Sequence, residues 1–213
     1  MLLPGSSGLK IFDDDQHYFR AADTISTAGF DVLVVDYKAA YRGAATGPAG
    51  TTGSKIAWVV EQVINEARRN GAIREGEQGA LVAWSLGAEG LWDLFENGRA
   101  EAMGVAACVA YYPSNEDGVP LDPPVPVLVL QGEGDNVTPA AQARAWLKPS
   151  AMLEVVYYPG AHHGFDVASL SPARTVSLIP FIGPRGTFGF DDRAAPDSAD
   201  RTRGFLDRSV ARR

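Results

Sequence analysis

The stretch ALVAWSLGAEGLW, residues 80 to 92, decides how this chain can fold. Its first five residues are apolar without interruption, which is typical of a short strand that is covered on both faces. After Ser85, the residues Ala88, Leu91 and Trp92 recur at helical spacing and mark an apolar helix face. The stretch therefore predicts a buried strand that runs directly into a helix, with Ser85 at the junction.

The same two patterns alternate along the rest of the chain. Strands in alternation with helices indicate an α/β fold, with a mostly parallel sheet of about six strands and helices on both faces. The chain start, MLLPGSSG, has the form of a strand tail that enters a glycine-rich loop, so strands that would normally precede it are missing from the pattern. The other predicted strands cover residues 30 to 37, 79 to 84, 104 to 112, 125 to 131 and 153 to 158.

Start and stop signals predict where the helices lie. Thr138 has the side chain of a helix cap, and Pro139 suits the first position of the helix that follows. Residues 179 to 200 are rich in Gly, Pro and Asp, so we expect a surface loop there, followed by a final helix from about Ser198. Three further helices are predicted. One begins near Asp13, one covers 56 to 67 with a stop at Gly71, and one runs from Ser85 to about 97.

Composition limits the class of protein. With 213 residues, of which 46% are hydrophobic, the chain can bury one substantial core, and we expect residues 1–213 to form a single domain. No run approaches the roughly 20 apolar residues that a membrane span needs, and the start lacks the form of a signal peptide. We therefore expect a soluble, cytoplasmic protein that does not bind membranes.

Charge and cysteine content narrow the partners. A net charge of −7, with scattered Lys and Arg, argues against nucleic acid as a partner. Cys108 is the only cysteine, which excludes an internal disulfide and a metal cluster built on thiolates. Because it lies within an apolar run, we expect a buried thiol that serves packing.

Three reactive side chains follow three of the predicted strands. Ser85, Asp135 and His163 each come just after an apolar run, and parallel strands bring their carboxyl ends to one edge of the sheet. The order Ser, Asp, His is that of the nucleophile-elbow hydrolases. Each residue also has a simpler interpretation, as a helix cap, a turn acid or an exposed loop histidine. Glu133 and His162 are the nearest substitutes for the acid and the histidine.

The residue types suit nucleophilic catalysis. A serine hydroxyl becomes a nucleophile when an imidazole takes its proton and a carboxylate orients that imidazole. The tight turn needs small neighbours: Ala83, where glycine is usual, adds only a methyl group, and Gly87 and Gly90 allow close approaches. The free N–H groups of the helix start can stabilise an oxyanion. Such a mechanism requires neither a metal nor a cofactor.

Five motifs of the chain resemble a known family. They are LPGSSG near the start, LVVDY at the end of the next run, AWSLGAEG at the elbow, QGEGDNVTP around the acid and YPGAHHGFD around the histidine. Together they resemble the α/β-hydrolase superfamily and, within it, the dienelactone hydrolase family, over almost the whole chain. The resemblance implies His163 as the catalytic histidine, and the backbone N–H groups of Leu86 and Ser6 as the oxyanion hole. Ser85 stands where the family has a cysteine, and in this respect the chain resembles the esterase-type members. That resemblance implies a small ester or lactone as the substrate.

Other side chains near the strand ends are weaker candidates. Tyr112, Trp84 and Arg42 are candidates for the lining of a substrate pocket, although core packing explains the two aromatic residues equally well. His17 lies in the acidic region where the first helix begins, and we expect it at the surface.

Two alternatives to an esterase stay open. The same triad serves a thioesterase or a peptidase, because the elbow does not specify the leaving group. If the loop that carries Ser6 is distorted, the oxyanion hole is lost, and the chain is instead a binding protein that keeps the hydrolase fold with little turnover. The exposed sheet edge at the short N-terminus favours pairing into a homodimer.

Overall fold

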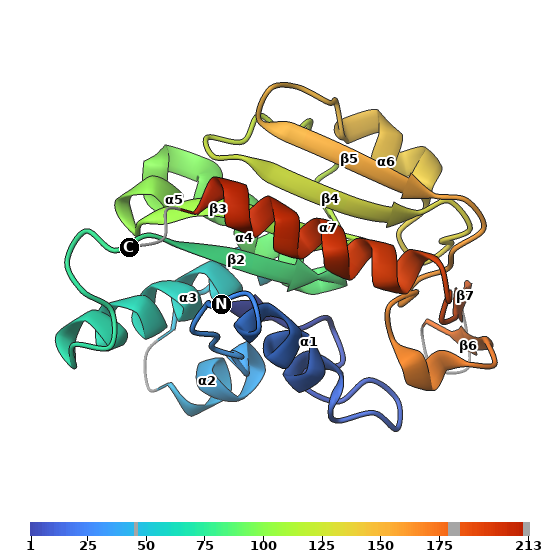
Figure 1. Cartoon of the computed structure of the whole chain (residues 1–213), viewed down its shortest axis with the longest axis horizontal. Helices are drawn as coiled ribbons and strands as arrows, with labels where there is room; N and C mark the ends of the chain where they lie inside the picture. The colour runs from blue at the N-terminus through green and yellow to red at the C-terminus, as the bar shows by residue number, and fades with distance from the viewer. Residues whose placement is uncertain (45–46, 179–183, 211–213) are drawn as a thin grey trace.

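The protein is built on one five-stranded parallel sheet (Figure 1). The computed structural model describes residues 1–44, 47–178 and 184–210. Every strand pair in this sheet is parallel, with Leu2 opposite Val82 at one side and Gly132 opposite Tyr158 at the other. The strands lie in chain order and are β1 (Leu2–Leu3), β2 (Gly79–Trp84), β3 (Val105–Tyr111), β4 (Val127–Gly132) and β5 (Leu153–Tyr158).

Helices cover both faces of the sheet, as the alternating pattern predicts. In Figure 1, α7 crosses in front of the sheet and α4 lies behind it. None of the helices in the described ranges has an apolar stretch long enough to cross a membrane. The α-helices are α1 (His17–Ser26), α2 (Tyr37–Gly43), α3 (Thr52–Arg69), α4 (Glu89–Phe95), α5 (Arg99–Ala102), α6 (Ala140–Trp146) and α7 (Ala194–Ser209), and the short 3-10 helices are η1 (Ser85–Ala88), η2 (Glu96–Gly98) and η3 (Ala168–Leu170).

The sheet separates two hydrophobic cores. Successive side chains of a strand point to opposite faces, so Leu81 and Ala83 pack on the side of α3, α4 and α6, while Val82 and Trp84 pack on the side of α1 and α7. Burial of both faces explains why the strands have nearly continuous apolar sequences. Cys108 is fully buried in the first of these cores, as its apolar surroundings predict.

The predicted strand at 30 to 37 is wrong over most of its length. Only Val34 bridges Leu2, through hydrogen bonds from Leu2 N–H to the Leu33 carbonyl and from Val35 N–H to the Leu2 carbonyl. Asp36 then accepts a hydrogen bond from Ala39 N–H and begins α2. This segment therefore adds a single bridge to the sheet, which has five strands where about six were expected.

The starts of the first and last helices also differ from the prediction. The first helix begins at His17 and not near Asp13, because Ile11 and Asp14 exchange two backbone hydrogen bonds and hold a tight turn before it. The last helix begins at Ala194 and not near Ser198, because the Asp191 side chain accepts the N–H groups of Arg193 and Ala194.

The helix that was predicted to start at Pro139, after a Thr138 cap, starts one residue later. It begins at Ala140, with Pro139 at the cap position and no side-chain cap, and Thr138 makes its hydrogen bonds elsewhere. The helix α3, in contrast, ends at Arg69 and is followed by Gly71 with φ +78, as the glycine stop predicts.

A second, two-stranded sheet extends into the loop that was predicted over 179 to 200: its second strand lies in that range, and its first strand lies just before it. It consists of β6 (Arg174–Ser177) and β7 (Arg185–Phe188), which pair antiparallel. Residues 179–183 of the expected loop lie outside the described residues. Figure 1 places this hairpin at the end of the molecule toward which the strand arrows point. It therefore stands at the sheet edge where the candidate residues gather.

Candidate active site

Ser85 stands on a strained turn between β2 and η1. Its φ of +48 is unusual for a residue with a side chain, because the β-carbon then crowds the backbone. Ala83, which stands two residues before Ser85 where glycine is usual, is fully buried in the core, so the fold accommodates its methyl group. A β-carbon on Gly87 would lie 2.5 Å from the Leu3 carbonyl oxygen and 2.6 Å from that of Pro4, so only glycine fits there. The local sequence therefore forms the elbow that the small residues predict.

The structure brings Ser85, His163 and Asp135 together into one hydrogen-bonded chain. The Ser85 Oγ lies 3.1 Å from His163 Nε2, and His163 Nδ1 lies 2.8 Å from Asp135 Oδ2. Both His163 and Asp135 are 4% exposed. The two substitutes are occupied otherwise: His162 Nδ1 bonds the Gly134 carbonyl at 2.9 Å, and Glu133 pairs with Arg144. The geometry is that of a nucleophile, a base and an orienting acid.

Asp135 is held as a carboxylate by five neighbouring donors. Its Oδ1 accepts the backbone N–H groups of Val137 at 2.8 Å and Thr138 at 2.9 Å, and its Oδ2 accepts the Thr138 hydroxyl at 2.9 Å. Gln131 Nε2 lies 3.4 Å from the same Oδ2, to which His163 also bonds. Burial raises the pKa of Asp135, but His163 and the Thr138 bonds outweigh burial and hold the pKa below its ordinary value. Thr138, predicted as a helix cap, thus serves the acid.

Two aromatic rings flank the imidazole of His163. The Tyr112 ring centroid lies 4.4 Å from that of His163, and the Phe188 ring meets the imidazole edge-on at 5.3 Å. Phe188 comes from β7 and forms a parallel bridge with His163, and Gly189 N–H donates to the His163 carbonyl at 3.1 Å. The hairpin β6–β7 therefore fixes the loop that carries the histidine.

The glycine-rich loop after β1 packs against Ser85. A β-carbon added to Gly5 would lie 3.4 Å from Ser85 Cβ, which places the loop containing Ser6 beside the nucleophile candidate. Gly5 N–H donates to the Tyr18 hydroxyl at 2.9 Å, and the Tyr37 hydroxyl donates to the Gly5 carbonyl at 3.1 Å. Both tyrosines are buried, so this loop is held from two elements, α1 and α2.

The two expected oxyanion donors belong to the two segments that meet at Ser85. Leu86 lies in the first turn of η1, where N–H groups have no acceptor within the helix. Ser6 is exposed, and its carbonyl accepts a hydrogen bond from Lys38 Nζ, which orients the peptide next to its N–H. Within the described ranges, no acceptor engages the Ser6 N–H.

The expected pocket residues have different surroundings. Tyr112 is buried against His163, whereas Trp84 packs in the core with its ring stacked on Tyr111 at 5.0 Å between centroids. Arg42 is an exposed residue of α2, and no contact in the described part of the chain joins it to Ser85 or His163. His17, expected at the surface, is buried against Trp84 and Asp166.

Comparison with known proteins identifies the family. The model of the dienelactone hydrolase family matches residues 93–209, more than half of the chain. The fold is similar to a monoacylglycerol lipase from Paleococcus ferrophilus, at 13% identity and a TM-score of 0.61, covering 98% of this chain and 93% of the other. It is also similar to a CIB-like hydrolase from Thermoplasma acidophilum, at 14% identity and a TM-score of 0.59, covering 97% and 84%. A comparison with curated proteins gave no match. With its sheet, elbow and motifs, the chain belongs to the dienelactone hydrolase family, within the α/β hydrolases.

Proposed function

We propose that this protein is a serine hydrolase that cleaves small carboxylic esters or lactones through an acyl-enzyme intermediate on Ser85. The observation that carries the proposal is the hydrogen-bonded chain from Ser85 Oγ through His163 to Asp135. Membership of the family supports hydrolysis as the reaction class. The serine in place of a cysteine favours esters, as the sequence predicts.

The reaction begins at the serine hydroxyl. His163 Nε2 takes the proton from Ser85 Oγ, which attacks the carbonyl carbon of the ester and forms a tetrahedral oxyanion. The N–H groups of Leu86 and Ser6 donate hydrogen bonds to that oxygen, which carries its full charge only near the transition state. The bond to the alcohol oxygen then breaks, and His163 gives its proton to the departing alcohol.

Water completes the cycle on the acyl-enzyme. His163 takes a proton from a water molecule, whose oxygen attacks the acyl carbon and forms a second oxyanion in the same hole. The bond to Ser85 Oγ breaks, the serine recovers the proton from His163, and the carboxylic acid leaves. Asp135 stays ionised throughout, holds the proton on His163 Nδ1 and stabilises the imidazolium that forms twice in each cycle.

Substrate size follows from the surroundings of the site. Tyr112 and Phe188 occupy the space beside the imidazole, and the connections at this edge of the sheet carry no inserted helical domain within the described ranges. An ester with short acyl and alcohol parts, or a small lactone, suits this arrangement best. Longer chains would have to extend over the hairpin β6–β7.

A panel of p-nitrophenyl esters of increasing acyl length, together with a small lactone, tests the proposal. Wild type should hydrolyse the short esters fastest, and Ser85→Ala and His163→Gln should each lower kcat/KM by roughly a thousandfold or more. His162→Gln is the matched control, because its ring bonds the Gly134 carbonyl outside the chain of three residues, and it should retain activity within a few-fold. A folded wild type that hydrolyses none of these substrates would overturn the proposal.

A further inference from the structure

A second buried carboxylate lies next to the proposed triad. Asp166 follows His163 by three residues, and its side chain is 10% exposed. It accepts a hydrogen bond from Trp84 Nε1 at 2.7 Å and another from the Tyr112 hydroxyl at 2.8 Å. The mechanism above assigns no role to this group, and a buried carboxylate is costly to retain unless its partners compensate for the loss of water.

Both hydrogen-bond donors of Asp166 touch the proposed triad. Trp84 immediately precedes Ser85 at the end of β2, and the Tyr112 ring lies against the imidazole of His163. One carboxylate therefore ties together the strand that presents the nucleophile and the ring on which the base rests. Ser85 Oγ and His163 Nε2, which lie 3.1 Å apart, are thus each adjacent to one of the two donors.

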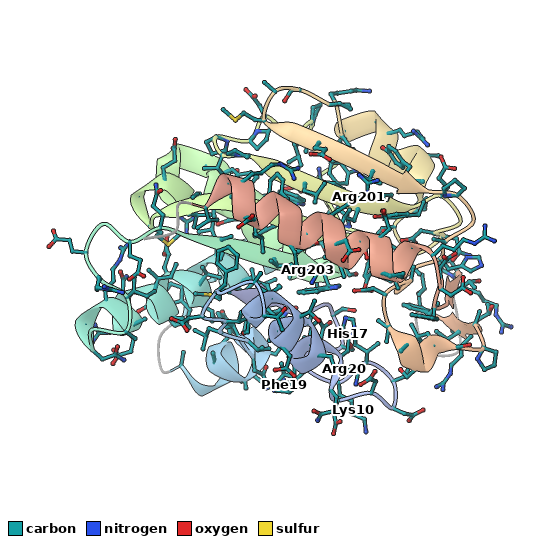
Figure 2. All side chains as sticks on the ribbon, viewed as in Figure 1. Lys10, His17, Phe19, Arg20, Arg201 and Arg203 are labelled. Atoms are coloured by element: carbon teal, nitrogen blue, oxygen red, sulfur yellow. The ribbon has the colours of Figure 1, made fainter. Side chains whose placement is uncertain are left out.

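The surroundings of Asp166 favour its charged form. Burial raises the pKa of this carboxyl, but the neighbouring His17 and the bonds from Trp84 and Tyr112 outweigh burial and hold the pKa below its ordinary value. His17 Nε2 lies 3.4 Å from Asp166 Oδ2. Among the described residues, this nitrogen has no hydrogen-bond partner. Figure 2 labels His17 and Arg20 on α1, and these two residues and Asp166 line a cavity of about 160 Å³ between α1 and α7. The carboxylate thus faces this cavity on one side and Trp84 and Tyr112 on the other.

Tyr112 also carries backbone strain that its contacts must hold. Its φ of +35 is rare for a tyrosine, and such a conformation persists only when its neighbours impose it. The Tyr112 N–H donates to the Leu130 carbonyl at 2.7 Å, and the hydroxyl at the far end of the ring is fixed by Asp166. Losing the second contact would leave the ring free to tilt away from His163.

We propose that Asp166 is a positioning residue for the reaction at Ser85, holding Tyr112 against His163 and Trp84 beside the elbow so that the imidazole stays aligned with the hydroxyl. The proposal rests on the proposed hydrolase function. An asparagine at this position would have one acceptor oxygen, and its NH2 group could not accept a hydrogen bond. Either Trp84 Nε1 or the Tyr112 hydroxyl would therefore lose its acceptor. A misaligned base lowers the rate of the chemical step without removing substrate contacts.

A double-mutant cycle tests this role. Asp166→Asn and Tyr112→Phe should each lower kcat by about tenfold to a hundredfold with KM within twofold, and the double variant should lose no more than the worse single variant. Asp197→Asn is the control, because it makes the same change from carboxylate to amide at a side chain of α7 that also accepts a hydrogen bond from a tyrosine hydroxyl, that of Tyr158 at 2.9 Å, away from the proposed triad. That control should keep the wild-type kcat.

A second readout does not depend on turnover. The proton on His163 Nδ1, shared with Asp135, should give a low-field proton NMR signal in wild type and in Asp197→Asn, and this signal should broaden in Asp166→Asn and Tyr112→Phe. Unchanged kcat and an unchanged signal in folded Asp166→Asn, or additive losses in the double variant, would overturn the proposal. Failure of the hydrolase function would appear differently, as a wild type without ester turnover or a Ser85→Ala variant that retains it.

Discussion

Backbone strain in this protein gathers around one imidazole. In the described ranges, the non-glycine residues with positive φ are Phe12, Ser85 and Tyr112. Ser85 bonds His163, Tyr112 packs against its ring, and Phe12 packs edge-on against Phe188, which in turn contacts His163. Strain of about 1–3 kcal/mol per residue persists where the surrounding structure enforces it, and it is common at functional sites.

Replacing the strained serine separates stability from activity. We predict that Ser85→Gly is more stable than Ser85→Ala by about 1 kcal/mol, because glycine adopts a φ of +48 without crowding, while both variants lose turnover. Urea unfolding at neutral pH measures the difference. The control pair is Asn65→Gly and Asn65→Ala on the exposed face of α3, where the order should reverse because alanine favours a helix. Equal stability of the two Ser85 variants would contradict the strain argument.

Asp135, the proposed orienting acid, gives a second prediction. Asp135→Asn should fold and bind substrate, but its kcat should fall by about ten-thousandfold, because an amide no longer fixes the proton on His163 Nδ1. Glu133→Gln, two residues away and paired with the exposed Arg144, should stay near wild type. Steady-state kinetics on a short p-nitrophenyl ester compares them, and equal losses in the two variants would contradict the assignment of the acid.

Individual residues were predictable from sequence where a strand end fixes their position. Ser85, Asp135 and His163 each follow an apolar run, so the fold alone brings them to one edge. Thr138 was visible beside the acid, but its cap role competed with the role that the structure gives it. Phe188 had no such signal, because its contact with His163 joins separate segments of the chain.

At the scale of elements, the elbow depends on close backbone contact between η1 and the end of β1. We predict that Gly87→Ala destabilises the protein by roughly 2 kcal/mol or more, because its β-carbon would overlap the Leu3 and Pro4 carbonyl oxygens. Gly43→Ala, at the end of α2 with open space around it, should change stability by less than about 0.5 kcal/mol. Thermal unfolding measures both. A Gly87→Ala variant as stable as Gly43→Ala would mean that the turn has more room than the structure describes.

Element type was predictable, and element boundaries were less so. Buried parallel strands and the amphipathic α3 have strong periodic patterns, which the structure confirms. Two of the errors occur where one aspartate side chain accepts a backbone N–H: Asp36 begins α2 soon after the bridge at Val34, and Asp191 begins α7 early. Such choices depend on local hydrogen bonds that hydrophobic periodicity does not record.

For the molecule as a whole, buried carboxylates link stability to pH. The pKa values of Asp135 and Asp166 lie below the ordinary value of 3.8 in the folded state, so the unfolded chain takes up protons first as pH falls. The contribution of these two carboxylates to the free energy of unfolding is complete at pH values above 3.8. It is lost as the pH falls through their lower pKa values in the folded state. Burial raises the pKa of Glu89 above its ordinary value of 4.5. This group therefore favours the folded state as the pH falls through that raised pKa.

We therefore predict that the free energy of unfolding decreases as pH falls from about 4 to about 2. The slope should be shallower in Asp166→Asn, because one fewer carboxyl then differs between the folded and unfolded states. Urea unfolding at a series of pH values measures this slope. An Asp166→Asn variant with the wild-type slope would show that the carboxyl titrates alike in both states.

If Ser85 is the nucleophile, an electrophile that mimics the substrate should react with its hydroxyl. Covalent labelling with a fluorophosphonate probe, followed by intact-mass measurement and peptide mapping, tests this. We predict a single adduct on Ser85 in wild type, a much slower adduct in His163→Gln and none in Ser85→Ala. A folded wild type that stays unlabelled, or an adduct that persists in Ser85→Ala, would show that Ser85 is not the nucleophile.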